Sequence, residues 1–237
     1  MSRSLRVAVI GDFDPAFAPH RFTNEGISHA ALRLGVSADV VWLPTQPLEQ
    51  DLGDVKRADV IWCAPGSPYK SLRGAVAGLR YARENNVPTL GTCGGCQHII
   101  IEYARNVLGF MDAQHAEYDP YASTLFVSEL ACSTAGQTMP VTLDSGSRAA
   151  QIYGRTQVEE QYYCNFGLNP KFQKVLDEGG LRITGFDEGG EARVLELPAH
   201  PFYMATLFVP QARSTAERPH PLILGLLAVA IGAAAPN

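Results

Sequence analysis

The sequence lacks a basic run, a membrane-length apolar run and a leader-like N-terminus. Its 19 Lys and Arg residues are outnumbered by 24 Asp and Glu residues, and the formal net charge of −5 argues against a nucleic-acid partner. The apolar run at residues 222–235 is too short to cross a bilayer comfortably and predicts a packed helix. The first strand follows the N-terminus directly, without the apolar core and cleavage site of a signal peptide. We therefore expect a cytoplasmic protein with no membrane partner.

Cysteine is scarce and mostly widely spaced. The chain has five cysteines, which are Cys63, Cys93, Cys96, Cys132 and Cys164. In a cytosolic chain an odd, scattered set of this kind predicts free thiols rather than a disulfide framework. A zinc site would need a second ligand pair, and the sequence offers none at suitable spacing. We expect no metal and no cofactor.

Repeats, low-complexity tracts and linkers rich in Gly, Ser or Pro are absent as well. The length suffices for one large domain, and we expect residues 1–237 to form a single domain. In the first half, strands are expected at residues 5–10, 38–43 and 59–63, and helices at 24–34 and 72–86. This alternation predicts an α/β fold whose central sheet is mostly parallel and flanked by helices.

The second half of the sequence is less regular. Strands are expected at residues 124–130, 138–143, 157–165 and 202–209, a hairpin at 181–186 and 191–197, and helices at 171–177 and 221–235. The hairpin is expected because two glycines and two acidic residues at 187–190 separate its apolar arms.

One stretch, residues 88–105, concentrates the chemistry of this sequence. It reads PTLGTCGGCQHIIIEYAR and predicts a buried strand, a glycine-rich turn and a helix, with Cys93 at the corner. Such a corner lifts a side chain out of the C-terminal edge of a sheet, where hydrolases display nucleophiles. A helix that opens at Gly94 would favour the thiolate form of Cys93, and the Gly94 N–H would be a natural oxyanion donor.

The same corner allows a second interpretation. Cys93 and Cys96 form a C-x-x-C pair at a helix start, which is the arrangement of a dithiol redox motif. A thiol-redox protein that uses these two cysteines therefore stays open as an alternative.

The pattern Gly91-x-Cys93-x-Gly95-x-Gln97 resembles the nucleophile motif of class I glutamine amidotransferases. The flanking stretches at residues 101–118 and 200–225 are similar to the amidotransferase domain of CTP synthases. The resemblance runs over nearly the whole chain and leaves no room for the synthase domain that normally comes first. It implies a class I amidotransferase-like α/β fold with a nucleophile-elbow cysteine.

The resemblance also implies roles for residues outside the corner. It places Gly66 and Ser67 on the loop that completes the oxyanion hole with Gly94. It implies that Gln97 and Glu117 hold the substrate. Where the family has an arginine for the carboxylate of glutamine, this chain has Asn165, which removes a charged bidentate clamp.

The largest departure from the family lies near the C-terminus. A Phe-His-Pro-Glu word normally supplies the base and its orienting carboxylate, but here Val209 and Gln211 stand at those two positions. His115 is a candidate replacement, because it precedes Glu117 by two residues and both would project to one side of an extended segment. A Cys93–His115–Glu117 cluster would restore a thiolate–imidazole pair, while the alternative for His115 is a loop histidine with no role.

Three functions are compatible with these patterns. The first is Cys93-dependent hydrolysis or transfer on a small amide- or ester-like substrate, with poor or no glutaminase activity. The second is a catalytically silent binding or regulatory subunit of a partner enzyme. The third is the thiol-redox protein. A small-molecule substrate or ligand is expected in the first two cases, and the oligomeric state stays open.

Overall fold

A nine-stranded sheet is the largest element of the computed structural model, which describes residues 4–131 and 133–233. Its parallel half consists, in order across the sheet, of β2 (Ser37–Leu43), β1 (Ser4–Ile10), β3 (Val60–Cys63), β4 (Thr89–Thr92) and β12 (Tyr203–Thr206). Its antiparallel half continues with β11 (Ala192–Glu196), β10 (Arg182–Phe186), β7 (Thr138–Leu143) and β8 (Gln157–Gln161).

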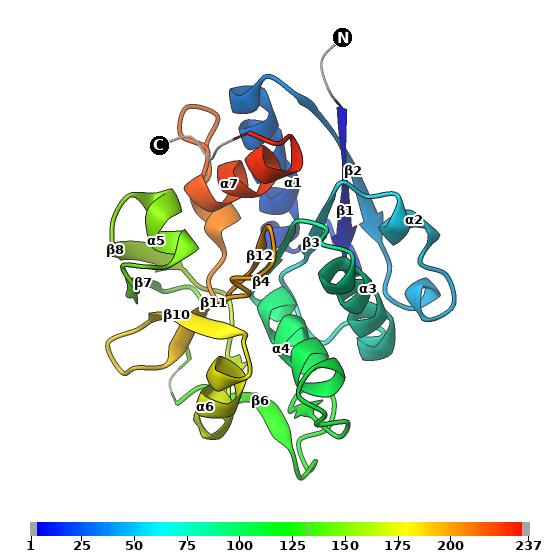
Figure 1. Ribbon diagram of the computed structural model, residues 1–237, viewed down its shortest axis with the longest axis vertical. Coiled ribbons are helices and arrows are strands. Elements are labelled where there is room, and N and C mark those ends of the chain that lie inside the picture. The colour runs from blue at the N-terminus through cyan, green and yellow to red at the C-terminus, as the bar shows by residue number, and fades with distance from the viewer. Residues whose placement is uncertain (1–3, 132, 234–237) are drawn as a thin grey trace.

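Helices cover both faces of this sheet (Figure 1). One face carries α1 (Ala18–Leu34), α5 (Arg148–Tyr153) and α7 (Pro221–Ala230), and the other carries α3 (Leu72–Glu84), α4 (Gly94–Asn106) and α6 (Pro170–Glu178). Strand β1 shows why both cores form. Its Val7 and Val9 pack on the first face while Ala8 and Ile10 pack on the second, so a strand without polar alternation is buried on both sides. The predicted α/β class is confirmed.

Smaller elements complete the molecule. A three-stranded sheet of β5 (Gln114–His115), β6 (Leu125–Glu129) and β9 (Phe166–Leu168) packs against α4. A short helix α2 (Gly53–Lys56) and the 3-10 helices η1 (Pro47–Glu49) and η2 (Pro210–Arg213) fill connections. Helix η2 returns the chain from β12 to a position beside α1.

Two helices differ from the sequence-based expectation. Helix α1 begins six residues before the predicted start at residue 24, because Pro19 suits a first helical turn, and it therefore includes His20. Helix α5 was not predicted, although its start carries a signal. The Ser147 side chain accepts a hydrogen bond from the Ala150 N–H at 3.0 Å, and Gly154 ends the helix in the left-handed conformation.

The strand expected at residues 157–165 ends at Gln161, and residues 162–165 connect the large sheet to β9. The predicted C-terminal helix ends at Ala230, and residues 234–235 of that prediction lie outside the described part of the chain. Within residues 4–131 and 133–233, no helix is both long enough and apolar enough to span a membrane.

The corner between β4 and α4 is held by direct backbone packing. Cys93 has φ 52° and ψ −111°, a conformation that costs a non-glycine residue about 1–3 kcal/mol. A Cβ atom on Gly94 would lie 2.0 Å from the Gly66 carbonyl oxygen, and one on Gly95 would lie 2.0 Å from the Cys63 carbonyl oxygen. Only glycine lets the backbone that follows β3 approach this closely.

Replacing Gly95 with alanine should therefore destabilise the fold. We expect Gly95→Ala to lower the free energy of unfolding by about 2 kcal/mol or more, since the new methyl group overlaps a backbone carbonyl that cannot rotate away. Urea unfolding followed by circular dichroism measures the change. Gly146→Ala is the matched control, because no heavy atom lies within 4 Å of its added Cβ. Equal stability of the two variants would contradict the packing argument.

Candidate active site

Strand β4 and helix α4 fix Cys93 from both sides. Its backbone N–H donates to the Thr206 carbonyl oxygen on β12 at 2.9 Å. Its own carbonyl oxygen accepts from the Cys96 and Gln97 N–H groups, at 3.0 and 3.3 Å, and so opens the helix. The helix has 13 residues and no acidic residue in its first turn, so its positive end faces the cysteine without competition. The side chain is 3% exposed.

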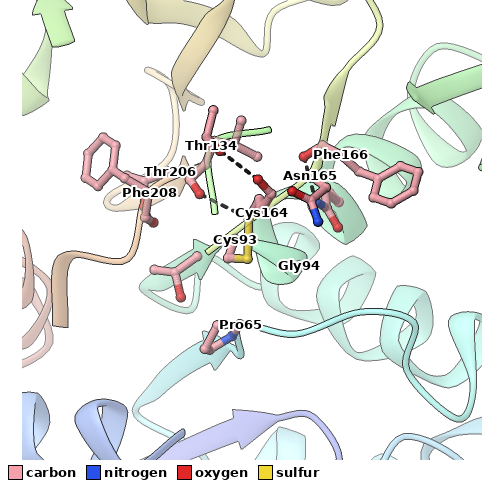
Figure 2. The surroundings of a disulfide bond; sticks show 12 residues. Pro65, Cys93, Gly94, Thr134, Cys164, Asn165, Phe166, Thr206 and Phe208 are labelled. Atoms are coloured by element: carbon pink, nitrogen blue, oxygen red, sulfur yellow. Dashed lines mark hydrogen bonds between the residues drawn. A yellow bond between two sulfur atoms is a disulfide. The ribbon is translucent and has the colours of Figure 1, made fainter. Parts of the chain in front are cut away.

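The Cys93 sulfur is bonded to Cys164. The two Cα atoms lie 5.9 Å apart, and 71 positions separate the residues in the sequence (Figure 2). The prediction of free thiols is therefore wrong for this pair, while Cys63 and Cys96 are free and buried as expected. Cys132 lies outside the described residues. The physical reason is topological: the connection from β8 to β9 crosses the nucleophile corner, and cysteine spacing alone carries no information about that crossing.

The segment that carries Cys164 is held by neighbouring polar groups. The Cys164 carbonyl oxygen accepts a hydrogen bond from the Thr134 hydroxyl at 2.6 Å, and its sulfur lies 3.3 Å from the Leu207 carbonyl oxygen. The next residue, Asn165, is exposed, and its side-chain oxygen accepts from the Ser133 hydroxyl at 2.6 Å. Figure 2 shows Thr134 and Asn165 on the two sides of the bonded sulfurs.

The loop predicted to hold an oxyanion lies against the corner. Gly66, with φ 92°, places its backbone against Gly94, and Ser67 hydrogen-bonds the Glu117 carboxylate. Burial raises the pKa of Glu117, and the bond from Ser67 partly offsets that effect. A cavity of about 230 Å³ borders this loop, and His20 lines it with its Nε2 atom 2.9 Å from the Pro65 carbonyl oxygen.

His115 is bound to Gln97 rather than to Cys93. Its Nε2 lies 2.9 Å from the Gln97 side-chain oxygen, and its Nδ1 accepts a hydrogen bond from the Glu117 N–H at 3.0 Å. Since Nδ1 accepts, Nε2 carries the proton and donates to Gln97. Burial, with the nearby His98, lowers the pKa of His115 to about 3, so the ring is neutral. Within residues 4–131 and 133–233 no hydrogen bond joins His115 to Cys93.

Gln97, His115 and Glu117 lie together, but they do not form the Cys93–His115–Glu117 cluster considered from the sequence. The Gln97 amide also donates to the Phe166 carbonyl oxygen at 2.8 Å, which ties α4 to β9. His115 holds the Gln97 side chain in place. It does not act as the imidazole base considered for the Cys93 sulfur in this geometry.

The resemblance drawn from the sequence singled out Val209 and Gln211, and both lie beside the corner. Val209 is buried, and it presents only methyl groups and a backbone N–H that donates to the Gln161 carbonyl oxygen at 2.8 Å. The Gln211 amide donates to the hydroxyls of Thr23 and Thr92, at 3.0 and 3.2 Å, and its side-chain oxygen is buried without a partner among the described residues. Since Thr92 directly precedes Cys93, the C-terminal segment reaches the corner, and neither Val209 nor Gln211 has an imidazole or carboxylate side chain.

Cys164 is the site residue that sequence reasoning missed, because it is bonded to Cys93. One signal was available: the resemblance placed Asn165 beside the substrate, and the residue before it is a cysteine. Two residues adjacent in the chain cannot lie far from the same pocket. The structure bears on both points. Strand β8 ends at Gln161, so residues 162–165 form a connection, and Cys164 in this connection is bonded to Cys93.

Buried neutral histidines make the stability of this site depend on pH. Burial lowers the pKa of His115 from 6.5 to about 3 and that of His98 from 6.5 to about 4. Between these values and 6.5 the unfolded chain binds more protons than the folded chain, so stability is complete above about pH 6.5 and falls as the pH falls toward 3.

We expect the free energy of unfolding to drop by about 2 kcal/mol per histidine between pH 7 and pH 5. His115→Gln should remove its share of this drop, because an amide does not titrate. Urea unfolding at the two pH values measures the difference. A pH dependence that is the same in the variant and the parent would contradict the assignment of a buried neutral His115.

The chain matches proteins of known kind along its length. The family model for class I glutamine amidotransferases matches residues 22–229. The CTP synthase of Coprothermobacter proteolyticus is 35% identical, over 99% of this chain and 46% of the relative. The CTP synthase of Methanopyrus kandleri is 34% identical, over 96% of this chain and 45% of the relative. The chain therefore spans about half the length of these curated relatives.

Solved structures agree. The glutaminase domain of Trypanosoma brucei CTPS with bound acivicin superposes with a TM-score of 0.88 and 25% identity, covering 98% of this chain and 96% of that one. A glutamine amidotransferase of Thermotoga maritima, with a TM-score of 0.60 and 14% identity over 96% of this chain and 96% of that one, shows the same fold. The chain belongs to the class I glutamine amidotransferase family and, within it, is similar to the glutaminase domain of CTP synthases.

Proposed function

We propose that this chain is an amidotransferase-like protein that hydrolyses glutamine poorly or not at all, and that Cys93 acts on a small ester- or amide-like substrate when its bond to Cys164 is reduced. The observation that carries the proposal is the neighbourhood of Cys93: Gln211 reaches Thr92 beside the nucleophile, while Val209 fills the position of the base with methyl groups. The nucleophile is kept and its proton partner is missing.

The corner can still supply two parts of acyl transfer. The first turn of α4 favours the thiolate form of Cys93, which then needs no base to attack a carbonyl carbon. The N–H of Gly94, with one from the Gly66–Ser67 loop, would stabilise the oxyanion, and the close packing of Gly66 on Gly94 supports this assignment. Collapse of the adduct would expel the leaving group and leave a thioester, which water hydrolyses.

The missing base decides which substrates suit this site. An amine leaving group must take up a proton as the C–N bond breaks, and the Nε2 proton of His115 is already donated to Gln97. An ester with a stable alkoxide or phenoxide leaving group does not need that proton. Esters are therefore the favoured substrate class.

Free glutamine is also poorly matched to the pocket. Asn165 replaces the family's arginine, and its side-chain oxygen is engaged with Ser133. A neutral amide cannot form the charged, bidentate pair that an arginine forms with a carboxylate. Glutamine would lose both its carboxylate clamp and its proton donor.

A binding or regulatory subunit is the second candidate. The curated relatives are CTP synthases about twice as long as the matched region, which supports a role beside a partner enzyme that supplies the remaining chemistry. In this role the cavity of about 230 Å³ beside the Gly66–Ser67 loop would bind a small molecule without turnover. A partner subunit would then be required for any activity.

Ester hydrolysis separates these candidates. With p-nitrophenyl acetate as the probe, the reduced protein should release p-nitrophenol in a burst that Cys93→Ala abolishes and Cys96→Ala leaves intact, because Cys96 is fully buried on the other face of the sheet. A rate that does not change in Cys93→Ala would contradict catalysis by this sulfur and favour the binding subunit.

Glutaminase activity should be low and partly recoverable. We expect the reduced protein to release ammonia from glutamine about a thousandfold or more slowly than a Val209→His, Gln211→Glu, Asn165→Arg variant, since triad residues act as a unit. The rate of ammonia release is measured for both proteins. Cys93→Ala in the variant background is the control. A Cys93-dependent glutaminase rate in the parent that equals that of the variant would contradict the proposal.

A further inference from the structure

We propose that Cys93 and Cys164 form a redox-active couple that a small hydroperoxide oxidises and a dithiol reduces. This activity goes beyond the proposed ester chemistry, because it uses the two sulfurs and needs no carbonyl substrate. The redox hypothesis drawn from the sequence paired Cys93 with Cys96. Here Cys164 replaces Cys96, since the structure joins Cys93 to Cys164 and leaves Cys96 free.

The position of Cys96 excludes it as the partner. Cys93 packs in the core on the α1 and α7 face of the sheet, whereas Cys96 packs with Cys63 in the core on the α3 and α4 face. Burial raises the pKa of Cys96 and raises that of Cys63 to about 12, so both stay protonated thiols. The C-x-x-C spacing of Cys93 and Cys96 therefore does not mark a redox pair.

Both bonded cysteines are held by contacts that do not depend on their bond. The Cys93 N–H is fixed by Thr206, at 2.9 Å, and the Cys164 carbonyl by Thr134, at 2.6 Å. Their Cα atoms are 5.9 Å apart, within the usual range for a disulfide. Reduction therefore leaves the two thiols facing each other, ready to close again.

The two sulfurs have different surroundings, and this difference indicates which one attacks and which one resolves. Cys93 sits at the positive end of α4, so its thiolate form is favoured and it is the attacking sulfur. Cys164 lies in the connection between β8 and β9 rather than at the start of a helix, and exposed Asn165 follows it in the chain. A reductant that attacks the Cys164 sulfur would release Cys93 as the better-stabilised thiolate, which is the faster direction of exchange.

This chemistry needs none of the groups that the site lacks. The Cys93 thiolate attacks the terminal oxygen of a hydroperoxide, an S–O bond forms, the O–O bond breaks, and the departing alkoxide takes a proton from solvent to become an alcohol. The Cys164 sulfur then attacks Cys93, the S–S bond forms, and hydroxide leaves with the Cys164 proton as water. Neither step uses a base at position 209.

A dithiol completes the cycle with balanced electrons. Its first thiolate bonds the Cys164 sulfur and frees Cys93, and its second thiolate closes the reductant's own disulfide and frees Cys164. One hydroperoxide and one dithiol thus become one alcohol, one water and one disulfide. Burial of both sulfurs, each 3% exposed, favours small oxidants over protein disulfides.

The test follows the oxidation of the full chain after reduction with dithiothreitol and removal of the reductant. We expect hydrogen peroxide to consume two thiols and to yield a peptide that links Cys93 to Cys164. Cys93→Ser should slow thiol loss at least about tenfold at pH 7, the factor expected from a larger thiolate fraction. Cys164→Ser should stop at a sulfenic acid on Cys93 that dimedone traps. Cys96→Ser is the matched control and should behave like the parent.

Several results would overturn the proposal: an unchanged rate in Cys93→Ser, no dimedone adduct in Cys164→Ser, linkage of Cys93 to another cysteine, or reaction with hydroxyethyl disulfide but not with peroxide. Circular dichroism of each variant verifies folding. The p-nitrophenyl acetate assay on Cys164→Ser separates the two activities, because ester hydrolysis should survive the loss of the resolving sulfur while peroxide-dependent oxidation of dithiothreitol should not.

Discussion

The contact between two backbones is the constraint on which the site depends. Gly94 and Gly95 pack directly on the carbonyl groups of Gly66 and Cys63. This contact leaves no room for a side chain at either glycine. This contact holds Cys93 at φ 52° and places the first turn of α4 next to its sulfur. Nucleophile, helix dipole and candidate oxyanion donors therefore come from one rigid feature of the fold.

The residues around this corner limit the chemistry that we propose for it. A sulfur that attacks an amide needs a proton donor for the leaving group, and Val209 and Gln211 supply none. A sulfur that attacks an ester or a hydroperoxide needs its negative charge, which a position at the start of α4 favours. Cys164 adds a second sulfur, which is bonded to Cys93. We therefore propose acyl chemistry for the reduced site and none for the oxidised site, in which the Cys93 sulfur is bonded to Cys164.

The sequence predicted the parts of the molecule that local patterns encode. Apolar strands, the Gly-rich corner and the hairpin of β10 and β11 were all visible, because side-chain periodicity and turn residues decide them. The antiparallel half of the sheet, the start of α1 and the disulfide depend on packing between segments far apart in the chain. His115 shows the same limit: its spacing from Glu117 was informative, but its hydrogen bond to Gln97 comes from α4 and no local pattern encodes it.

The most direct test of this account is the reactivity of Cys93 itself. The fully reduced protein would be alkylated with iodoacetamide across a pH series, and the modification of Cys93 read by peptide mapping. An activated sulfur at the start of α4 predicts a rate that rises well below pH 8.5, about where a free cysteine ionises. A Cys93 that is inert, or whose rate rises only where a free cysteine would, contradicts both the ester chemistry and the redox couple and leaves the site as a binding pocket.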